Sequence, residues 1–169
     1  SNLTALRELA LRRTADQVDE QMLTQLRQRG VEGPWPTAER LLVCVGGDEL
    51  AERVIRSAAR MAEALKSDWI AIHFALADRE EEDLTRRKRV DKALRLAERL
   101  GATTIRVLAK DLTAEILSYA KRNNITQIVV GRSAPRGWLG IFRQSLSDEI
   151  MAQAKGLSVT VIVPDKDAI

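Results

Sequence analysis

Near the carboxyl end of the chain, a glycine, a serine and several arginines lie between an apolar run and a helical pattern. Gly131 ends the run QIVVG, and Ser145 stands three residues before Asp148, the spacing of a capping box at a helix start. Backbone amides at a helix start and guanidinium groups both attract phosphate, which makes an anion site one interpretation. A helix cap preceded by a solvated basic loop fits equally well. The arginines of this loop are Arg132, Arg136 and Arg143.

A second loop, VGGDE at 45–49, follows the first apolar run of the chain's main part. Gly46 and Gly47 allow the backbone to turn sharply or to approach a ligand, and we expect Asp48 to cap the helix that follows. A turn from strand to helix often needs glycine for its geometry alone. A structural role is therefore the favoured interpretation, and ligand contact is the alternative.

Trp138 and Phe142 lie in the arginine-rich loop. An aromatic ring beside arginines can stack on a nucleic-acid base, but such residues more often pack a loop onto its own domain or onto a partner. The formal net charge of +3 is a small excess from many charges of both signs, so nucleic acid is not an expected partner.

Candidate catalytic and metal-binding residues are scarce. Cys44 lies inside the apolar run LLVCV, where a buried small hydrophobe is the favoured interpretation. His73 lies within a strand-like run without nearby cysteines or a clear carboxylate pair. We therefore expect no catalytic constellation and no metal site.

Alternating elements position these loops. Short apolar runs, rich in β-branched residues, alternate with helical patterns that show apolar residues three and four apart. Continuous apolar strands joined by helices predict an open parallel sheet with helices on both faces, and ligands in such sheets gather at the carboxyl ends of the strands. The strands are expected at 40–46, 68–76, 103–109, 126–132 and 157–164, and the helices at about 49–66, 84–100, 112–123 and 142–155.

Ahead of this pattern, residues 3–29 have helical spacing, and GVEGPWPT then brings glycines and prolines that separate units. We predict a helical extension over 1–36 and an α/β domain over 37–169. The apolar stripe of the extension, with Leu6, Leu9 and Met22, should seek this domain or a second copy, which makes a homodimer one expectation. No apolar run is long enough to span a membrane and no secretory signal is evident, so the prediction is cytoplasmic.

Residues 40–164 resemble the universal stress protein family, through LLVCVGGDELAERVIRSAARMAEAL and QIVVGRS. This resemblance implies a five-stranded sheet of order 3-2-1-4-5. It also implies a nucleotide loop of the form Gly-x-x-Gly, nine residues, Gly-Ser/Thr after the fourth strand. Gly131 and Ser145 match that loop, whereas Ala134 and Gln144 replace its other glycines and Gly46 stands where the family has an aspartate.

These departures bear on nucleotide binding. The side chains of Ala134 and Gln144 occupy space where the family backbone closes on phosphates, and neither residue adopts positive φ as easily as glycine. ATP is therefore not expected to bind tightly in the family manner, and no cofactor is required. The arginines of the loop leave room for a different anion.

The amino-terminal NLTALRELALRRTADQVDEQM resembles the segment that leads into a universal-stress-like domain in potassium-responsive sensor histidine kinases. The resemblance implies a non-catalytic regulatory domain on the cytoplasmic side of a kinase in the inner membrane. Its expected partners are the other domains of that kinase and a universal stress protein or small anionic ligand. The alternative is a working sensor of ATP or a cyclic dinucleotide. An ATP-cleaving enzyme is disfavoured, because the serines that such families place around the glycines of the first loop are lacking.

The residues expected to bind a ligand or partner lie in the two loops. They are Gly46, Gly47, Asp48, Gly131, Arg132, Ser133, Arg136, Trp138, Arg143 and Ser145.

Overall fold

The computed structural model describes residues 3–10, 38–76, 84–132 and 145–165. Two compact units divide the chain, Ser1–Ala38 and Glu39–Ile169. In the first unit, residues 3–10 form a helix in which Leu3, Leu6 and Leu9 are exposed. Residues 11–36 of the predicted extension lie outside the described residues.

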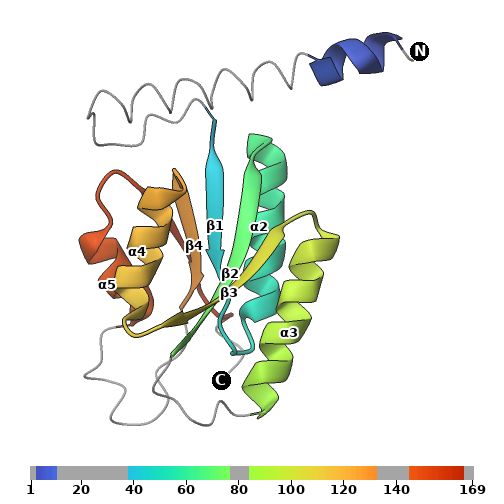
Figure 1. Ribbon diagram of the computed structural model, residues 1–169. Helices are drawn as coiled ribbons and strands as arrows, with labels where there is room; N and C mark the ends of the chain where they lie inside the picture. The colour runs from blue at the N-terminus through green and yellow to red at the C-terminus, as the bar shows by residue number, and fades with distance from the viewer. Residues whose placement is uncertain (1–2, 11–37, 77–83, 133–144, 166–169) are drawn as a thin grey trace. The chain divides into compact units, whose positions relative to one another are not determined.

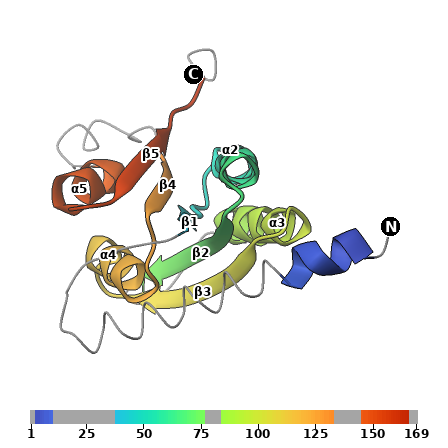
Figure 2. The ribbon, with the colours of Figure 1, turned by 90° about the horizontal axis from the view of Figure 1, so that it is seen from above.

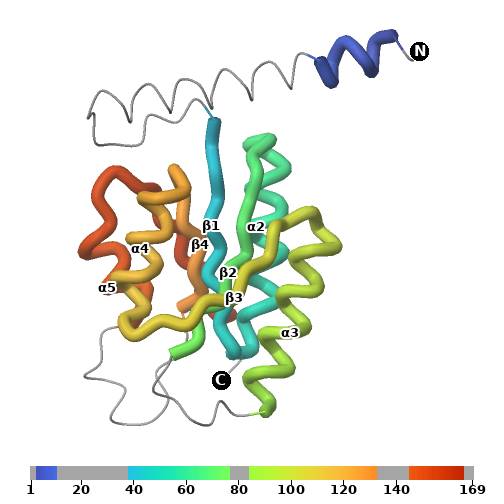
Figure 3. Tube along the Cα trace, in the orientation of Figure 1, coloured from blue at the N-terminus to red at the C-terminus, as the bar shows by residue number. Residues whose placement is uncertain are grey.

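The second unit is built on a five-stranded sheet of order β3-β2-β1-β4-β5, in which every pair of neighbours is parallel (Figures 1 and 2). This confirms the predicted fold and strand order. The Cα trace places β1 between β2 and β4, so the strand order reverses beside it (Figure 3). The strands are β1 (Arg40–Cys44), β2 (Asp68–Leu76), β3 (Thr103–Ala109), β4 (Gln127–Gly131) and β5 (Ser158–Ile162).

Helices cover both faces of the sheet, because each parallel connection crosses over one face. Figure 2 shows α2 and α3 on one face and α4 and α5 on the other. Along β1 the side chains alternate: Leu41 and Val43 join the core under α2 and α3, and Leu42 joins the core under α4 and α5. The helices are α2 (Ala51–Leu65), α3 (Leu84–Arg99), α4 (Leu112–Arg122) and α5 (Leu146–Gln153).

The helix ends differ slightly from the sequence prediction. α2 begins at Ala51, two residues later than expected, because the VGGDE turn and Leu50 occupy the chain before it. α5 begins after the N-cap residue Ser145, and residues 142–144 of the predicted helix lie outside the described residues. Helix α4 begins as expected, with the Asp111 side chain accepting a hydrogen bond from the Ala114 amide at 3.0 Å.

Candidate anion site at the strand-order reversal

The carboxyl ends of β1 and β4 lie side by side. Val43 of β1 is in register with Val129 of β4, so the turn after Cys44 and the chain at Gly131 meet at one edge of the sheet. Ligands bind at such reversals of strand order in open α/β sheets. We call this place the switch-point edge and define its described part as residues 45–50, Gly131, Arg132, Ser145 and Asp148.

Gly47 is explained by packing. A Cβ atom added at Gly47 would lie 2.9 Å from Cβ of Arg86 and 3.2 Å from the Arg86 carbonyl oxygen, so the first turn of α3 presses directly on this glycine. A Cβ added at Gly46 would meet only the Asp48 carboxylate, at 3.4 Å. This favours the structural role for Gly47, and it shows that Gly46 brings no side chain to the edge.

Asp48 lies at the start of α2, two residues before Leu50, the residue that precedes the helix. Its Oδ1 accepts a hydrogen bond from the Leu50 amide at 3.0 Å, and its backbone carbonyl oxygen accepts one from the Ala51 amide at 3.3 Å. A side-chain oxygen that accepts from the amide two residues on is the contact expected of a capping residue. The carboxylate therefore stabilises the turn that leads into α2.

Gly131 ends β4, where a Cβ atom would lie 3.0 Å from Cγ2 of Val54 in α2. The next amide, of Arg132, donates to the carbonyl oxygen of Ile162 at 2.8 Å and so keeps the chain on the sheet. The close approach of α2 gives this glycine a packing reason as well as a place at the edge.

The Arg132 guanidinium is not a free cation. Its Nη2 lies 3.9 Å from Oδ2 of Asp148, and both side chains are partly exposed. The pKa of Asp148 lies below its usual range, chiefly because of a hydrogen bond from Ser145 and also because of the Arg132 charge. Sequence reasoning missed this pair, although Asp148 lies within the helix predicted over 142–155 and could have been considered as a partner.

Ser145 caps α5 as predicted. Its Oγ accepts from the Asp148 amide at 3.3 Å and lies 2.8 Å from Oγ of Ser147, which is buried. Thr113 of α4 donates from Oγ1 to Oε2 of Glu149 at 2.7 Å and holds α5 against α4. The start of α5 is thus fixed, and a helix start carries the backbone amides that an anion site requires.

The remaining predicted site residues lie in the loop between Arg132 and Ser145. Ser133, Arg136, Trp138 and Arg143 lie outside the described residues, as do Ala134 and Gln144. Their predicted roles stay predictions.

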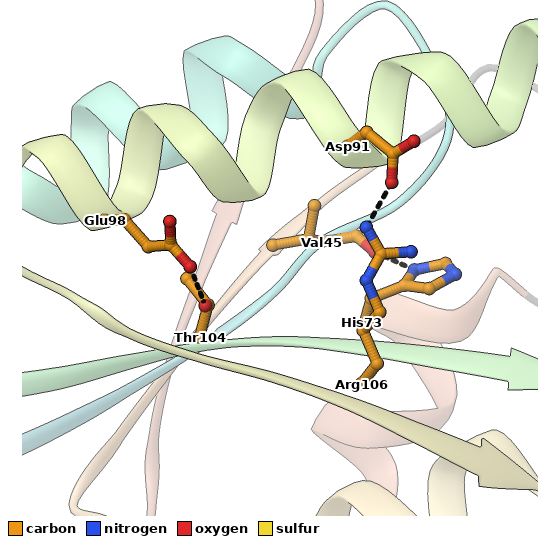
Figure 4. Close-up of polar contacts among 6 residues, drawn as sticks. All are labelled: Val45, His73, Asp91, Glu98, Thr104 and Arg106. Carbon is orange, nitrogen blue, oxygen red and sulfur yellow. Dashed lines mark hydrogen bonds and ion pairs between the residues drawn. The ribbon is translucent and has the colours of Figure 1, made fainter.

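His73 joins two strands below this edge. Its side chain is 7% exposed, and its Nδ1 lies 2.7 Å from the Val45 carbonyl oxygen (Figure 4). A carbonyl only accepts, so Nδ1 is the donor. The histidine therefore fastens the end of β1 to β2, a role that sequence spacing did not indicate.

The thiol of Cys44 is held in its neutral form. The side chain keeps some accessible surface, yet burial raises the pKa of the thiol to about 12. Among the described residues, no group of three histidine, cysteine, aspartate or glutamate side chains could hold a metal ion. The groups that the described part of the edge offers to a ligand are backbone amides, the Ser145 hydroxyl and the Arg132–Asp148 pair.

Comparison with known proteins places this geometry in a family. The sequence model of the universal stress protein family matches residues 37–162. A universal stress protein in complex with cAMP superimposes with a TM-score of 0.58 at 16% identity, covering 75% of this chain and 97% of that chain. One from Archaeoglobus fulgidus in complex with dAMP gives 0.52 at 19% identity, covering 73% and 96%. At these identities the structures show the shared fold.

Curated relatives extend the likeness beyond the family unit. Sensor protein KdpD of Escherichia coli is 36% identical over 98% of this chain, and that of Clostridium acetobutylicum is 32% identical over 96%. The chain spans 18% of the length of each of these relatives. No helix in the described ranges is long and apolar enough to cross a membrane. The sequence match over residues 37–162 and the 3-2-1-4-5 sheet together show that the chain belongs to the universal stress protein family.

Proposed function

We propose that this chain is a non-catalytic regulatory domain of a potassium-responsive sensor histidine kinase, which passes the state of a bound partner or anionic ligand to the rest of that protein. One observation carries the proposal. The likeness to sensor protein KdpD covers nearly the whole chain, including residues ahead of the family unit, while the chain spans 18% of those relatives. A domain that makes up about a fifth of a sensor kinase can regulate the activity of the kinase domain to which it is joined.

The switch-point edge supports a binding role. A helix start with its serine cap and an arginine beside it can hold an anionic group, and the ion pair of Arg132 with Asp148 can open to receive one. We propose that the domain lies on the cytoplasmic side of a kinase held in the cell membrane. Its partners are then the other domains of the kinase, a universal stress protein or a second copy.

Reversing the arginines of the loop tests this proposal. The variant Arg132→Glu, Arg136→Glu and Arg143→Glu in the full-length kinase should change signalling in response to potassium limitation and leave the domain folded, which its melting temperature checks. Kinase autophosphorylation and reporter output at low and high potassium are the measurements.

A matched control reverses exposed cations elsewhere in the domain, at Lys121, Arg122 and Lys155. The control should signal as the parent does, because it changes the net charge equally and leaves the switch-point edge intact. Normal signalling by the loop variant, with an unchanged melting temperature, would refute the proposed site.

A nucleotide sensor is the second candidate. Two structures of the same fold carry cAMP and dAMP, and Gly131 and Ser145 stand at two positions of the family's nucleotide loop. Against tight ATP binding, Gly46 brings no carboxylate to the edge and Arg132 already faces Asp148. The observations therefore favour the regulatory domain without a required nucleotide.

Calorimetry of the 169-residue chain with ATP, cAMP and a cyclic dinucleotide separates the candidates. We expect weak or absent ATP binding. Ala134→Gly with Gln144→Gly should raise the affinity for ATP more than a substitution at Gly46 does. Micromolar affinity of the unaltered chain for one of these nucleotides would make the nucleotide sensor the better function.

A further inference from the structure

The outer strand β3 leaves one backbone edge uncovered by any described strand. It pairs with β2 along its whole length, from Ile70↔Thr103 to Leu76↔Ala109, and it ends the strand order of the described sheet (Figure 2). In such a strand every second N–H and C=O points away from the sheet. β3 therefore offers a row of hydrogen-bonding positions, at every second residue, to another extended chain.

The side chains of β3 divide between the two faces. Thr104 and Arg106 face α3: the Thr104 hydroxyl donates to Glu98 at 2.6 Å, and Arg106 bonds to Asp91 (Figure 4). Ile105 and Val107 are half-buried in the core under α4. Leu108, on the α3 face by alternation, is 76% exposed, a large apolar side chain at an uncovered edge.

The α3 face of this edge is cationic. Asp91 bonds to Arg106, and its pKa is lowered chiefly by that hydrogen bond and further by the charges of Arg106, Arg95 and Arg87. Glu98 keeps its negative charge while it accepts from Thr104, and Arg89 and Lys92 of α3 pair with Glu49 and Glu52. The other cations of α3 still outnumber its two acids, Asp91 and Glu98. An open depression of about 460 Å³ lies along the seam between α3 and β3. We call β3 with Arg87, Asp91, Arg95 and Arg106 the β3 seam.

The excess of positive charge favours some binding partners of the β3 seam over others. A second copy of this edge would bring a surface of the same net positive charge against it, which opposes that pairing. An anionic surface without an extended backbone would leave the outward N–H and C=O groups of β3 unused. An acidic extended segment satisfies the charge, the backbone and the apolar side chains together.

We propose that the β3 seam binds an extended acidic segment of another protein or domain, which adds beside β3 as a sixth strand. Its carboxylates lie over Arg87, Arg95 and Arg106, and its apolar side chains extend the core beside Ile105 and Val107. The inference rests on the proposed function, which it deepens by giving the partner's chemistry and a surface separate from the switch-point edge.

The test uses a labelled nonapeptide of alternating glutamate and valine, with blocked ends, and the 169-residue chain. Fluorescence anisotropy should show saturable binding that weakens with salt, and amide resonances of 103–109 should shift most. Two isomers of the peptide carry the same number of backbone N-methyl groups, on glutamate nitrogens in one and on valine nitrogens in the other. Both keep the charge of the peptide, and they block opposite edges of it. Because only one edge of the peptide faces β3, one isomer should bind at least about tenfold more weakly and the other should bind normally.

Variants of the chain locate the site. Arg95→Glu with Arg106→Glu should weaken binding at least about tenfold, whereas the matched change Lys121→Glu with Arg122→Glu on α4 should leave it unchanged. The methylated peptides act on the unaltered chain, so the result stands even if the seam variant is unstable.

Equal binding of both methylated isomers would overturn strand addition and leave a general attraction for polyanions. Binding of the chain to vesicles containing anionic phospholipid, with no binding of the peptide, would overturn the proposal in favour of a lipid surface. If the peptide does not bind while the loop-arginine variant still alters potassium signalling, the proposed binding at the β3 seam is refuted and the regulatory function stands.

Discussion

The switch-point edge and the β3 seam lie in one sheet but use their residues differently. At the switch-point edge the two glycines are held by packing, Gly47 against α3 and Gly131 against α2, and the Arg132–Asp148 pair is exposed. At the β3 seam the polar contacts are exposed as well, and an ion pair joins Arg106 to Asp91. Motif residues at a site can therefore be explained largely by close packing, while unmatched charge lies at an edge without a motif.

The largest expected effect comes from filling the space at Gly47. Gly47→Ala should lower the free energy of unfolding by about 1–3 kcal/mol, because its Cβ would overlap backbone atoms of Arg86 that cannot rotate away. Urea unfolding followed by circular dichroism measures this. Gly46→Ala is the matched control and should change stability far less. Equal losses in the two variants would show that the backbone of the turn, rather than α3, requires glycine.

Removing the buried donor at His73 should have the next largest effect. His73→Phe leaves the Val45 carbonyl without its side-chain partner in a buried place, so the free energy of unfolding should fall by about 1–2 kcal/mol. The same urea titration applies, with binding of the acidic nonapeptide as a second readout that should not change. An unaltered midpoint would mean that this hydrogen bond adds nothing to the join between β1 and β2.

Removing a hydrogen bond at the β3 seam should lower the free energy of unfolding by less than the change at His73 does. Thr104→Val removes an exposed hydrogen bond to Glu98, and exposed contacts of this kind change stability by about 0.5 kcal/mol or less. Comparing its unfolding midpoint with that of His73→Phe tests whether the two regions differ in how firmly they are held. A loss as large as that of the histidine variant would contradict the difference.

The smallest effect is a pH dependence at Asp148. Its pKa in the folded chain lies below the unfolded value, so the carboxylate adds stability above the unfolded pKa and loses it as pH falls through the folded one. Asp148→Asn should therefore melt below the parent at pH 7, and the two melting temperatures should converge in acid. A difference that stays constant across the acidic range would assign the effect to shape rather than charge.

Much of the fold is predictable because strands and helices here have clear local patterns. Apolar runs rich in β-branched residues marked all five strands, and the serine three residues before Asp148 marked the start of α5. The strand order followed from the family resemblance, since periodicity along one chain does not tell which strands are neighbours.

The candidate site was less predictable because its decisive contacts join distant residues. Gly47 meets Arg86 across a strand and a helix, and Arg132 meets Asp148 across a loop, so no local pattern announces either contact. Asp48 shows that a short-range contact is easier to predict. Its capping role was expected from the local sequence, and its carboxylate accepts a hydrogen bond from the Leu50 amide just before α2 begins.

The central position of β1 determines when the switch-point edge can form during synthesis. Within the described sheet, β1 and its partner β2 leave the ribosome well before β4, yet the Arg40 amide bonds to Thr126 Oγ1 across 86 residues. Contacts of such long sequence separation form late and slowly. The nascent domain therefore passes through a stage in which β1 is paired on one side and open on the other. Until β4 arrives, that bare flank of β1 is where a chaperone or a neighbouring nascent chain would bind.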